Sequence, residues 1–283
     1  MCPAVVGEGG QRGYLIPIGG GEDKEANPSI LQRFVDLSGG KDANIIVLPT
    51  ASRLEDTGSR YEAIFTELGA GQVSSIPISG REDCNNPEFA ERCEEATGIF
   101  ITGGNQLRLS TILGGTDVAQ VIRKINARGV PIAGTSAGAS IMSEHMMAGG
   151  DADQGPTEGG AVLAPGLGLT NAAVIDQHFS ERNRLGRLLS AIALNPFLLG
   201  IGIDEDTAAF IGPDDMIEIV GSGTVTIADG KEMSYSSAHS ASRSEGIGML
   251  GLKLDILHEG CSYDLNSREA FPPLVEDNNL CNL

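Results

Sequence analysis

A serine lies between glycines in segment 134–138, which reads Gly-Thr-Ser-Ala-Gly and fits the pattern Gly-x-Ser-x-Gly. In hydrolases this pattern forms a nucleophile elbow, a sharp strand-to-helix turn that exposes a reactive hydroxyl. Apolar residues 130–133 predict a strand before the turn, and residues 139–147 have helical character after it. We interpret Ser136 as the nucleophile of a serine hydrolase. The alternative is a glycine-rich loop that binds phosphate or only turns the chain.

Acyl transfer at Ser136 also needs hydrogen-bond donors aimed at the developing oxyanion. The backbone amide of Ala137, at the start of the expected helix, is one candidate. A second is expected in segment 100–106, where a strand runs into a pair of glycines that ends in Gly104. Glycine would let the backbone approach a carbonyl oxygen closely. Gln106, in the same segment, could hold substrate through its amide.

A serine hydroxyl needs a general base, and histidine serves at neutral pH. The chain has four histidines. His178 follows the apolar segment 172–175 at a point where a strand turns into a helix, and we interpret it as the base. The orienting acid is expected in the acidic cluster 204–206 that follows the strand at 199–203, and within it we favour Glu205, because rigid elements position catalytic groups better than loops. Asp153, in the loop after the serine, is the alternative acid.

Three arginines follow the proposed base within two helical turns: Arg182, Arg184 and Arg187. Such a cluster is unusual in a chain this acidic. Arginines grouped in this way could bind carboxylates bidentately. The alternative is a surface helix with ordinary salt bridges.

The elements that must position these residues follow from the alternation of apolar and amphipathic runs. Strands are predicted at 14–18, 44–48, 73–78, 98–102 and 130–133, and helices at 30–37, 61–68, 87–96 and 118–128. This rhythm predicts an α/β fold with a mostly parallel, doubly wound sheet that helices cover on both faces. Later in the chain, residues 149–171 predict a loop and residues 180–194 a helix. Closely spaced antiparallel edge strands are predicted at 199–203, 208–211, 216–220 and 223–227. No linker marks a boundary, so we expect one domain over 1–283.

Composition excludes several classes of partner. The chain has 19 basic and 38 acidic residues, a formal net charge of −19, which argues against nucleic acid and anionic membranes. No apolar run approaches the roughly 20 residues of a membrane helix, and the start lacks a secretory signal pattern. Five scattered cysteines suggest neither a disulfide framework nor a zinc site. We therefore expect a cytoplasmic protein without a metal or other cofactor.

Several segments together resemble the cyanophycinase family, serine peptidases related to the aspartyl dipeptidase peptidase E. The resemblance covers most of the chain and rests on 18–24, 100–108, 134–140, 176–187 and 202–207. It implies a fold similar to class I glutamine amidotransferases, and a homodimer. It also implies an exopeptidase that degrades cyanophycin, a poly-aspartate carrying arginine on each side-chain carboxylate, to β-aspartyl-arginine dipeptides.

The same resemblance implies that Ser136 is the nucleophile, His178 the base and Glu205 its acid. The residues that it implies for the substrate pocket are Gln106, Asp176, Gln177, Arg182, Arg184 and Arg187. This chain departs from the family in the loop after the nucleophile, where Gln154 stands in place of a glutamate. The departure favours Glu205 over Asp153.

Two other readings of the sequence are open. One is an aspartyl dipeptidase, or an esterase of the ordinary α/β-hydrolase fold, in which a late histidine such as His258 would be the base. The other is a binding protein without catalytic activity on an amidotransferase-like scaffold. The direction of cutting and the preferred chain length do not follow from the sequence.

Overall fold

A computed structural model describes residues 2–151 and 154–273, so Asp153 lies outside the described residues. Its largest sheet has nine strands in the order β17-β16-β11-β10-β1-β5-β4-β2-β3. These strands are β1 (Leu15–Ile18), β2 (Asn44–Leu48), β3 (Gln72–Ser75), β4 (Gly98–Ile101), β5 (Ile132–Thr135), β10 (Thr207–Ile211), β11 (Met216–Gly221), β16 (Ser262–Asp264) and β17 (Glu269–Phe271). The five strands β1 to β5 run parallel, and the other four join antiparallel at one edge.

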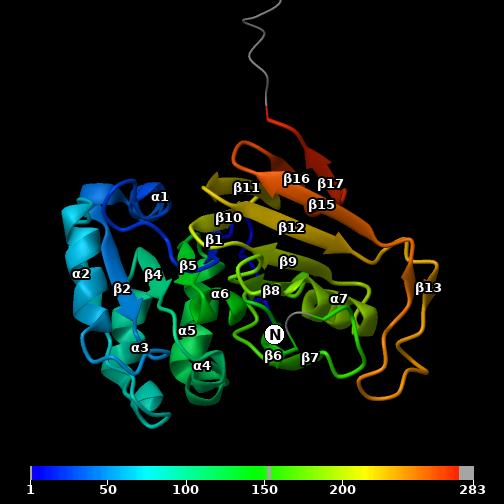
Figure 1. The fold of residues 1–283 in the computed structure, drawn as a ribbon. Helices are drawn as coiled ribbons and strands as arrows, with labels where there is room; N and C mark the ends of the chain where they lie inside the picture. The colour runs from blue at the N-terminus through cyan, green and yellow to red at the C-terminus, as the bar shows by residue number, and fades with distance from the viewer. Residues whose placement is uncertain (1, 152–153, 274–283) are drawn as a thin grey trace, which may run out of the picture.

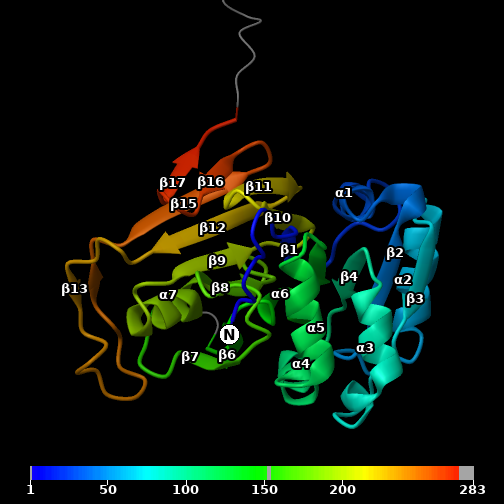
Figure 2. The same cartoon turned by 180° about the vertical axis from the view of Figure 1, so that it is seen from behind.

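A second sheet lies beside the first (Figures 1 and 2). It contains β8 (Ala173–Gln177), β9 (Leu199–Ile203), β12 (Thr224–Asp229) and β15 (Lys253–His258), in the order β15-β12-β9-β8. Strands β8 and β9 are parallel and are connected through helix α7 (Leu185–Leu194). The expected antiparallel edge therefore consists of β10 and β11, whereas β9 and β12 belong to this second sheet. Two short hairpins, β6 (His145–Gly150) with β7 (Ala161–Pro165) and β13 (Tyr235–Ser236) with β14 (Met249–Leu250), complete the strands.

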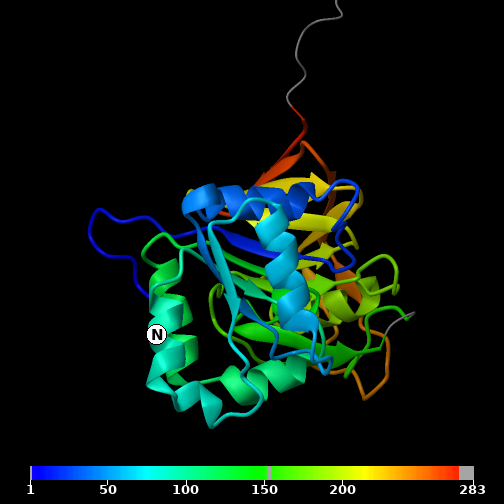
Figure 3. The ribbon, with the colours of Figure 1, turned by 90° about the vertical axis from the view of Figure 1, so that its left-hand side faces the viewer.

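Helices cover both faces of the parallel sheet, because side chains alternate between the faces along each strand. Ile16 and Ile18 pack in the same cluster as helices α1 (Ser29–Leu37) and α2 (Thr57–Glu67). Leu15 instead packs with α3 (Pro87–Glu94), α4 (Gln106–Leu113) and α5 (Asp117–Asn126). Figure 3 shows the two groups of helices on either side of the sheet. The predicted α/β class with a mostly parallel sheet is thus confirmed.

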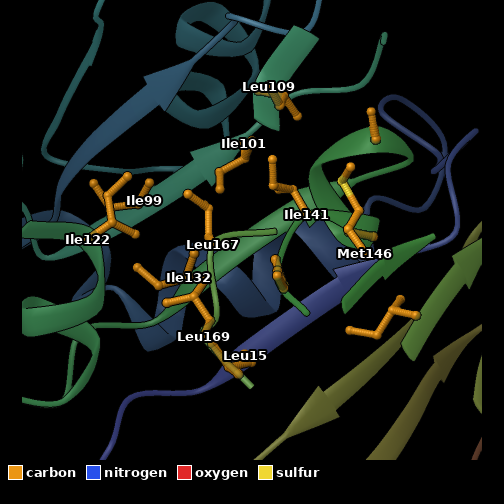
Figure 4. Close-up of a cluster of buried hydrophobic side chains, with 14 of the residues drawn as sticks. Leu15, Ile99, Ile101, Leu109, Ile122, Ile132, Ile141, Met146, Leu167 and Leu169 are labelled. Atoms are coloured by element: carbon orange, nitrogen blue, oxygen red, sulfur yellow. The ribbon is translucent and has the colours of Figure 1, made fainter. Parts of the chain in front are cut away.

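The larger core cluster joins the two sheets. Figure 4 shows part of it, where Ile99 of β4 lies near Ile122 of α5 and Ile101 of β4 lies near Leu109 of α4. The same cluster extends to Ile201 in the second sheet. Each fully buried side chain of this size stabilises the fold by about 1.5–3 kcal/mol. The shared core supports our proposal that the chain forms one domain.

Two predicted helices differ from the structure. The prediction of helical structure over residues 139–147 is wrong, since helix α6 covers only Ala137–Ser140 and strand β6 begins at His145. Met146 and Met147 are buried in the hairpin that β6 forms with β7. The helix expected from residue 180 begins at Leu185 after a turn. None of the described helices is long and apolar enough to cross a membrane.

Candidate active site

Ser136 occupies a tight turn between β5 and α6, with φ 54° and ψ −112°. Positive φ is uncommon for residues other than glycine and marks local strain. Two glycines make the turn possible. A Cβ on Gly134 would lie 2.3 Å from the carbonyl oxygen of Gly138, and a Cβ on Gly138 would lie 2.1 Å from that of Ile101. The flanking glycines of the motif are therefore required by packing.

Three strand ends bring a serine, a histidine and a glutamate together. The Ser136 Oγ lies 2.8 Å from His178 Nε2, and His178 Nδ1 lies 2.5 Å from Glu205 Oε1. Ser136 follows β5, His178 follows β8 and Glu205 follows β9. This sequence of contacts matches the nucleophile, base and orienting acid of a serine hydrolase relay.

The electrostatic setting of His178 suits a general base. The ring is half-buried, and burial lowers its pKa below the ordinary value of 6.5, although Glu205 acts in the opposite direction. The imidazole is therefore neutral at pH 7. A proton on Nδ1 that is donated to Glu205 leaves Nε2 free to accept the proton of the Ser136 hydroxyl.

A glycine-rich loop after β1 packs behind the histidine and the glutamate. The backbone N–H of His178 donates to the carbonyl of Gly19 at 2.8 Å. A Cβ on Gly20, whose φ is +103°, would lie only 2.4 Å from His178 Cε1. A Cβ on Gly21 would lie 3.0 Å from Glu205 Oε2. Only glycine allows the loop backbone to approach both side chains this closely.

Glu22, in the same loop, is a buried residue whose contribution sequence reasoning missed. Its Oε1 accepts a hydrogen bond of 2.6 Å from the Tyr61 hydroxyl, and its Oε2 accepts one of 2.6 Å from Thr135 Oγ1. Lys24 Nζ lies 3.0 Å from Oε1. Burial and the nearby Glu22 raise the pKa of Tyr61, so its hydroxyl stays a donor. Glu22 thus connects the loop and α2 to the residue before Ser136; the sequence signal was a carboxylate directly after a run of glycines.

The expected oxyanion donors lie in two adjacent turns. Ala137 follows Ser136 as the first residue of α6 and is buried. A Cβ on Gly103 would lie 3.2 Å from Ser136 Cβ, so the turn after β4 passes next to the serine. Gly104, with φ +145°, continues this turn, and a Cβ there would meet the carbonyl oxygen of Ala51 at 2.2 Å. The oxyanion role of Gly104 and Ala137 stays a prediction.

Three residues expected to bind substrate contact one another in the interior. The Arg187 guanidinium donates from Nε to Asp176 Oδ2 at 2.6 Å and from Nη2 to Asp176 Oδ1. Arg184 Nη1 lies 3.6 Å from the same Oδ1. Asp176 is 0% exposed, Arg187 4% and Arg184 8%. Burial lowers the pKa of Arg184 to about 10. These contacts describe a buried ion-pair cluster, and a direct role of the three residues in substrate binding stays a prediction.

The other three expected substrate residues have different settings. Gln177 is buried, and its side-chain oxygen accepts a hydrogen bond of 2.9 Å from Arg184. Arg182 is exposed, and its charge helps to lower the pKa of His178. Gln106, half-buried at the start of α4, donates from Nε2 to the carbonyl of Ala148 at 3.2 Å. Their substrate contacts also stay predictions.

Other candidates for chemistry lie apart from this arrangement. His258 is exposed on β15, where its Nδ1 donates to the carbonyl of Glu259 at 2.7 Å. Within 2–151 and 154–273, no group of three or more His, Cys, Asp or Glu residues could hold a metal ion. The four cysteines of these ranges are free thiols, and Cys281 lies outside them.

Comparisons with known proteins identify the family of the chain. The model of peptidase family S51 matches residues 15–219. A cyanophycinase from Geminocystis herdmanii is 41% identical over 268 residues, which is 94% of this chain and 98% of the relative. A cyanophycinase from Thermosynechococcus vestitus is 39% identical over 272 residues, or 94% of this chain and 84% of the relative.

Solved structures resemble the fold. A peptidase from an acI-B1 actinobacterium has a TM-score of 0.64 and 23% identity, over 93% of this chain and 98% of the other. A putative peptidase E protein from Listeria monocytogenes has a TM-score of 0.53 and 18% identity, over 75% of this chain and 100% of the other.

Proposed function

The chain belongs to peptidase family S51 and is a serine-type peptidase, and from this premise we propose that its substrate is cyanophycin. We infer an exopeptidase that cuts the poly-aspartate backbone and releases β-aspartyl-arginine dipeptides. The observation that carries the proposal is the Ser136–His178–Glu205 arrangement. It occurs in a chain about 40% identical to cyanophycinases over nearly its whole length.

In the acylation step, Ser136 Oγ attacks the carbonyl carbon of the scissile amide while His178 Nε2 takes the hydroxyl proton. The carbonyl π bond opens, and the amides of Ala137 and the Gly104 turn would stabilise the oxyanion. Glu205 stabilises the imidazolium that forms. The intermediate collapses when the C–N bond breaks and His178 gives its proton to the departing amine, which leaves an acyl-enzyme.

In the deacylation step, a water molecule replaces the departed amine. His178 takes a proton from the water, and the hydroxide oxygen bonds to the acyl carbon. The Ser136 Oγ–C bond then breaks, and Oγ recovers the proton from His178. The products are a free carboxylate and the original enzyme, so no cofactor is consumed.

Charge complementarity supports this substrate class. Each unit of cyanophycin carries a free carboxylate and a guanidinium on its arginyl arm. Arg182 is an exposed cation close enough to His178 to affect its pKa, and a carboxylate of the substrate could bind there. The net charge of −19 would attract the guanidinium groups of the polymer.

An aspartyl dipeptidase or an esterase is the weaker alternative. An esterase of the ordinary α/β-hydrolase fold would use a late histidine, but His258 is exposed and bonded to a backbone carbonyl on the outer strand β15. We further propose that the enzyme acts as a homodimer in the cytoplasm, as the family resemblance implies.

The proposed function is tested by incubating the protein with insoluble cyanophycin and measuring released β-aspartyl-arginine by mass spectrometry. We expect release by the unmodified protein and by His258→Ala, and none by Ser136→Ala or His178→Ala. Within residues 2–151 and 154–273, the Ser136 Oγ forms a hydrogen bond only with His178, so Ser136→Ala should fold as the unmodified protein does. No release by the unmodified protein, or equal release by Ser136→Ala, would refute the proposal.

A further inference from the structure

A cleft of about 420 Å³ lies at the carboxyl edge of the parallel sheet, on the opposite side of Ser136 from the second sheet. Its walls come from the loop after β2, which includes Arg53 and Glu55, and from Pro77 to Ser79 after β3. Arg108 of α4 closes one side. The volume lies within the roughly 300–1,000 Å³ of typical small-molecule sites. We call this cavity the β2–β3 cleft.

The β2–β3 cleft is connected to the nucleophile through the turn after β4. The Gly103 backbone packs against Ser136, and the neighbouring Gly104 packs against the carbonyl of Ala51. The N–H of Asn105 donates to that same carbonyl at 3.0 Å. Strand β2 is two strands from β5, a separation of about 10 Å at the usual spacing of neighbouring strands. One unit of an arginine-bearing polymer can bridge such a distance from a scissile bond at Ser136.

Arg108 is held as a preformed cation in the wall of the β2–β3 cleft. Its Nε donates to the carbonyl of Thr50 at 2.8 Å, and its Nη2 donates to that of Ser79 at 2.9 Å. Among the residues that the structure describes, its Nη1 has no recorded hydrogen-bond partner. A guanidinium fixed by two backbone acceptors loses little freedom when it binds a carboxylate.

The loop that forms the other wall is also fixed in place. The backbone N–H of Ser52 donates to the carbonyl of Pro49 at 2.9 Å. The Ser52 hydroxyl accepts a hydrogen bond of 3.0 Å from the N–H of Leu54 and lies 2.7 Å from Thr57 Oγ1. The exposed Arg53 and Glu55 side chains therefore extend from a turn that hydrogen bonds hold in place. Neither side chain forms a salt bridge within the described part of the chain.

The β2–β3 cleft thus presents two cations and one anion, none of which forms a salt bridge within the described residues. A ligand that matches them carries both a carboxylate and a cationic group. We propose that the β2–β3 cleft is a second substrate subsite, which binds the arginyl arm of the cyanophycin unit across the scissile bond from the unit near Arg182. The carboxylate of that arm would contact Arg108 and Arg53, and its guanidinium would contact Glu55. This inference rests on the proposed function.

The test uses a soluble peptide of two β-aspartyl-arginine units and variants of the two exposed residues. Arg53→Glu should raise KM about tenfold and leave kcat within twofold, because one charge-assisted contact is replaced by repulsion. Arg60→Glu reverses another exposed charge, on α2 and outside the cleft lining, and is the matched control. It should keep the KM of the unmodified enzyme.

Peptides in which citrulline replaces one arginine test the contact with Glu55. With Glu55 intact, the Ser136→Ala enzyme should bind one of the two citrulline peptides several-fold more weakly than the other, and adding Glu55→Gln should abolish that difference. Binding is measured by calorimetry in a Ser136→Ala background, so it does not depend on turnover. Unchanged affinities in Arg53→Glu and Glu55→Gln would overturn the subsite even if dipeptides are released. Absence of hydrolysis by the unmodified enzyme would instead refute the proposed function.

Discussion

Replacing Asp176 by Asn removes the only carboxylate recorded against Arg187 and Arg184 among the described residues. Asp176 is 0% exposed, and the two arginines are 4% and 8% exposed. Breaking a buried ion pair by removing one partner costs about 3–5 kcal/mol, because the other charge stays buried without compensation. Asn still accepts one hydrogen bond, so we expect the lower end, about 3 kcal/mol. A chain of this size loses about 2–4 °C in Tm per kcal/mol, which gives about 6–12 °C.

Thermal unfolding followed by circular dichroism measures this loss, and urea unfolding gives the free energy of unfolding independently. Arg182→Gln is the matched control. Arg182 is exposed in the turn between β8 and α7, so its replacement should leave Tm unchanged. If Asp176→Asn kept the Tm of the unmodified protein and only raised KM, Asp176 would be a substrate contact. The structural interpretation of the cluster would then be refuted.

Three further predictions concern His178 and the loop behind it. Since burial lowers the pKa of His178 below 6.5, kcat/KM should exceed half of its maximum at pH 6.5 and fall as the pH drops through that lowered pKa. A pH–rate profile with an acid midpoint above 6.5 would contradict this. Gly20→Ala places a Cβ 2.4 Å from the His178 ring at a residue whose φ is +103°, so it should abolish dipeptide release. Gly7→Ala, with no atom within 4 Å of its Cβ, is the control and should keep it. Activity in Gly20→Ala would exclude the close packing of the loop against His178. Glu22→Leu leaves the buried Tyr61 and Thr135 hydroxyls without their acceptor, so the free energy of unfolding should fall by about 3 kcal/mol. Urea unfolding measures this change, and a fall of under about 1 kcal/mol would count against the hydrogen bonds of Glu22 as a source of stability.

The parallel half of the fold could be predicted because its signals are local. The segment 44–48 is an apolar run that is buried on both faces, and the strand has the same bounds in the structure. Ser136 was predicted from its Gly-x-Ser-x-Gly motif, and His178 and Glu205 were predicted because each lies two or three residues after such a run. Carboxyl ends of strands are where open α/β sheets bind ligands, so these residues could be expected to converge without knowledge of side-chain positions.

The rest depends on contacts between distant segments. Segment 139–147 has apolar residues that suit either a helix or a strand, and its pairing with β7 decides for the strand. Strand β9 lies between β8 and β12, and no local pattern identifies β8 as its parallel neighbour. The spacing of Arg184 and Arg187 is the same whether they face solvent or the buried Asp176. Pairing and burial, which settle these cases, are properties of the whole fold.

The three residues of the relay come from different sheets. Ser136 extends from the nine-stranded sheet, whereas His178 and Glu205 extend from the four-stranded one. A shift of one sheet by about 1 Å would break the hydrogen bond between Ser136 and His178 while each sheet kept its own ladder of hydrogen bonds. The rate at which Ser136 reacts with a sulfonyl fluoride therefore reports whether the two sheets keep their relative position. In mild denaturant this reactivity should disappear before the secondary structure does.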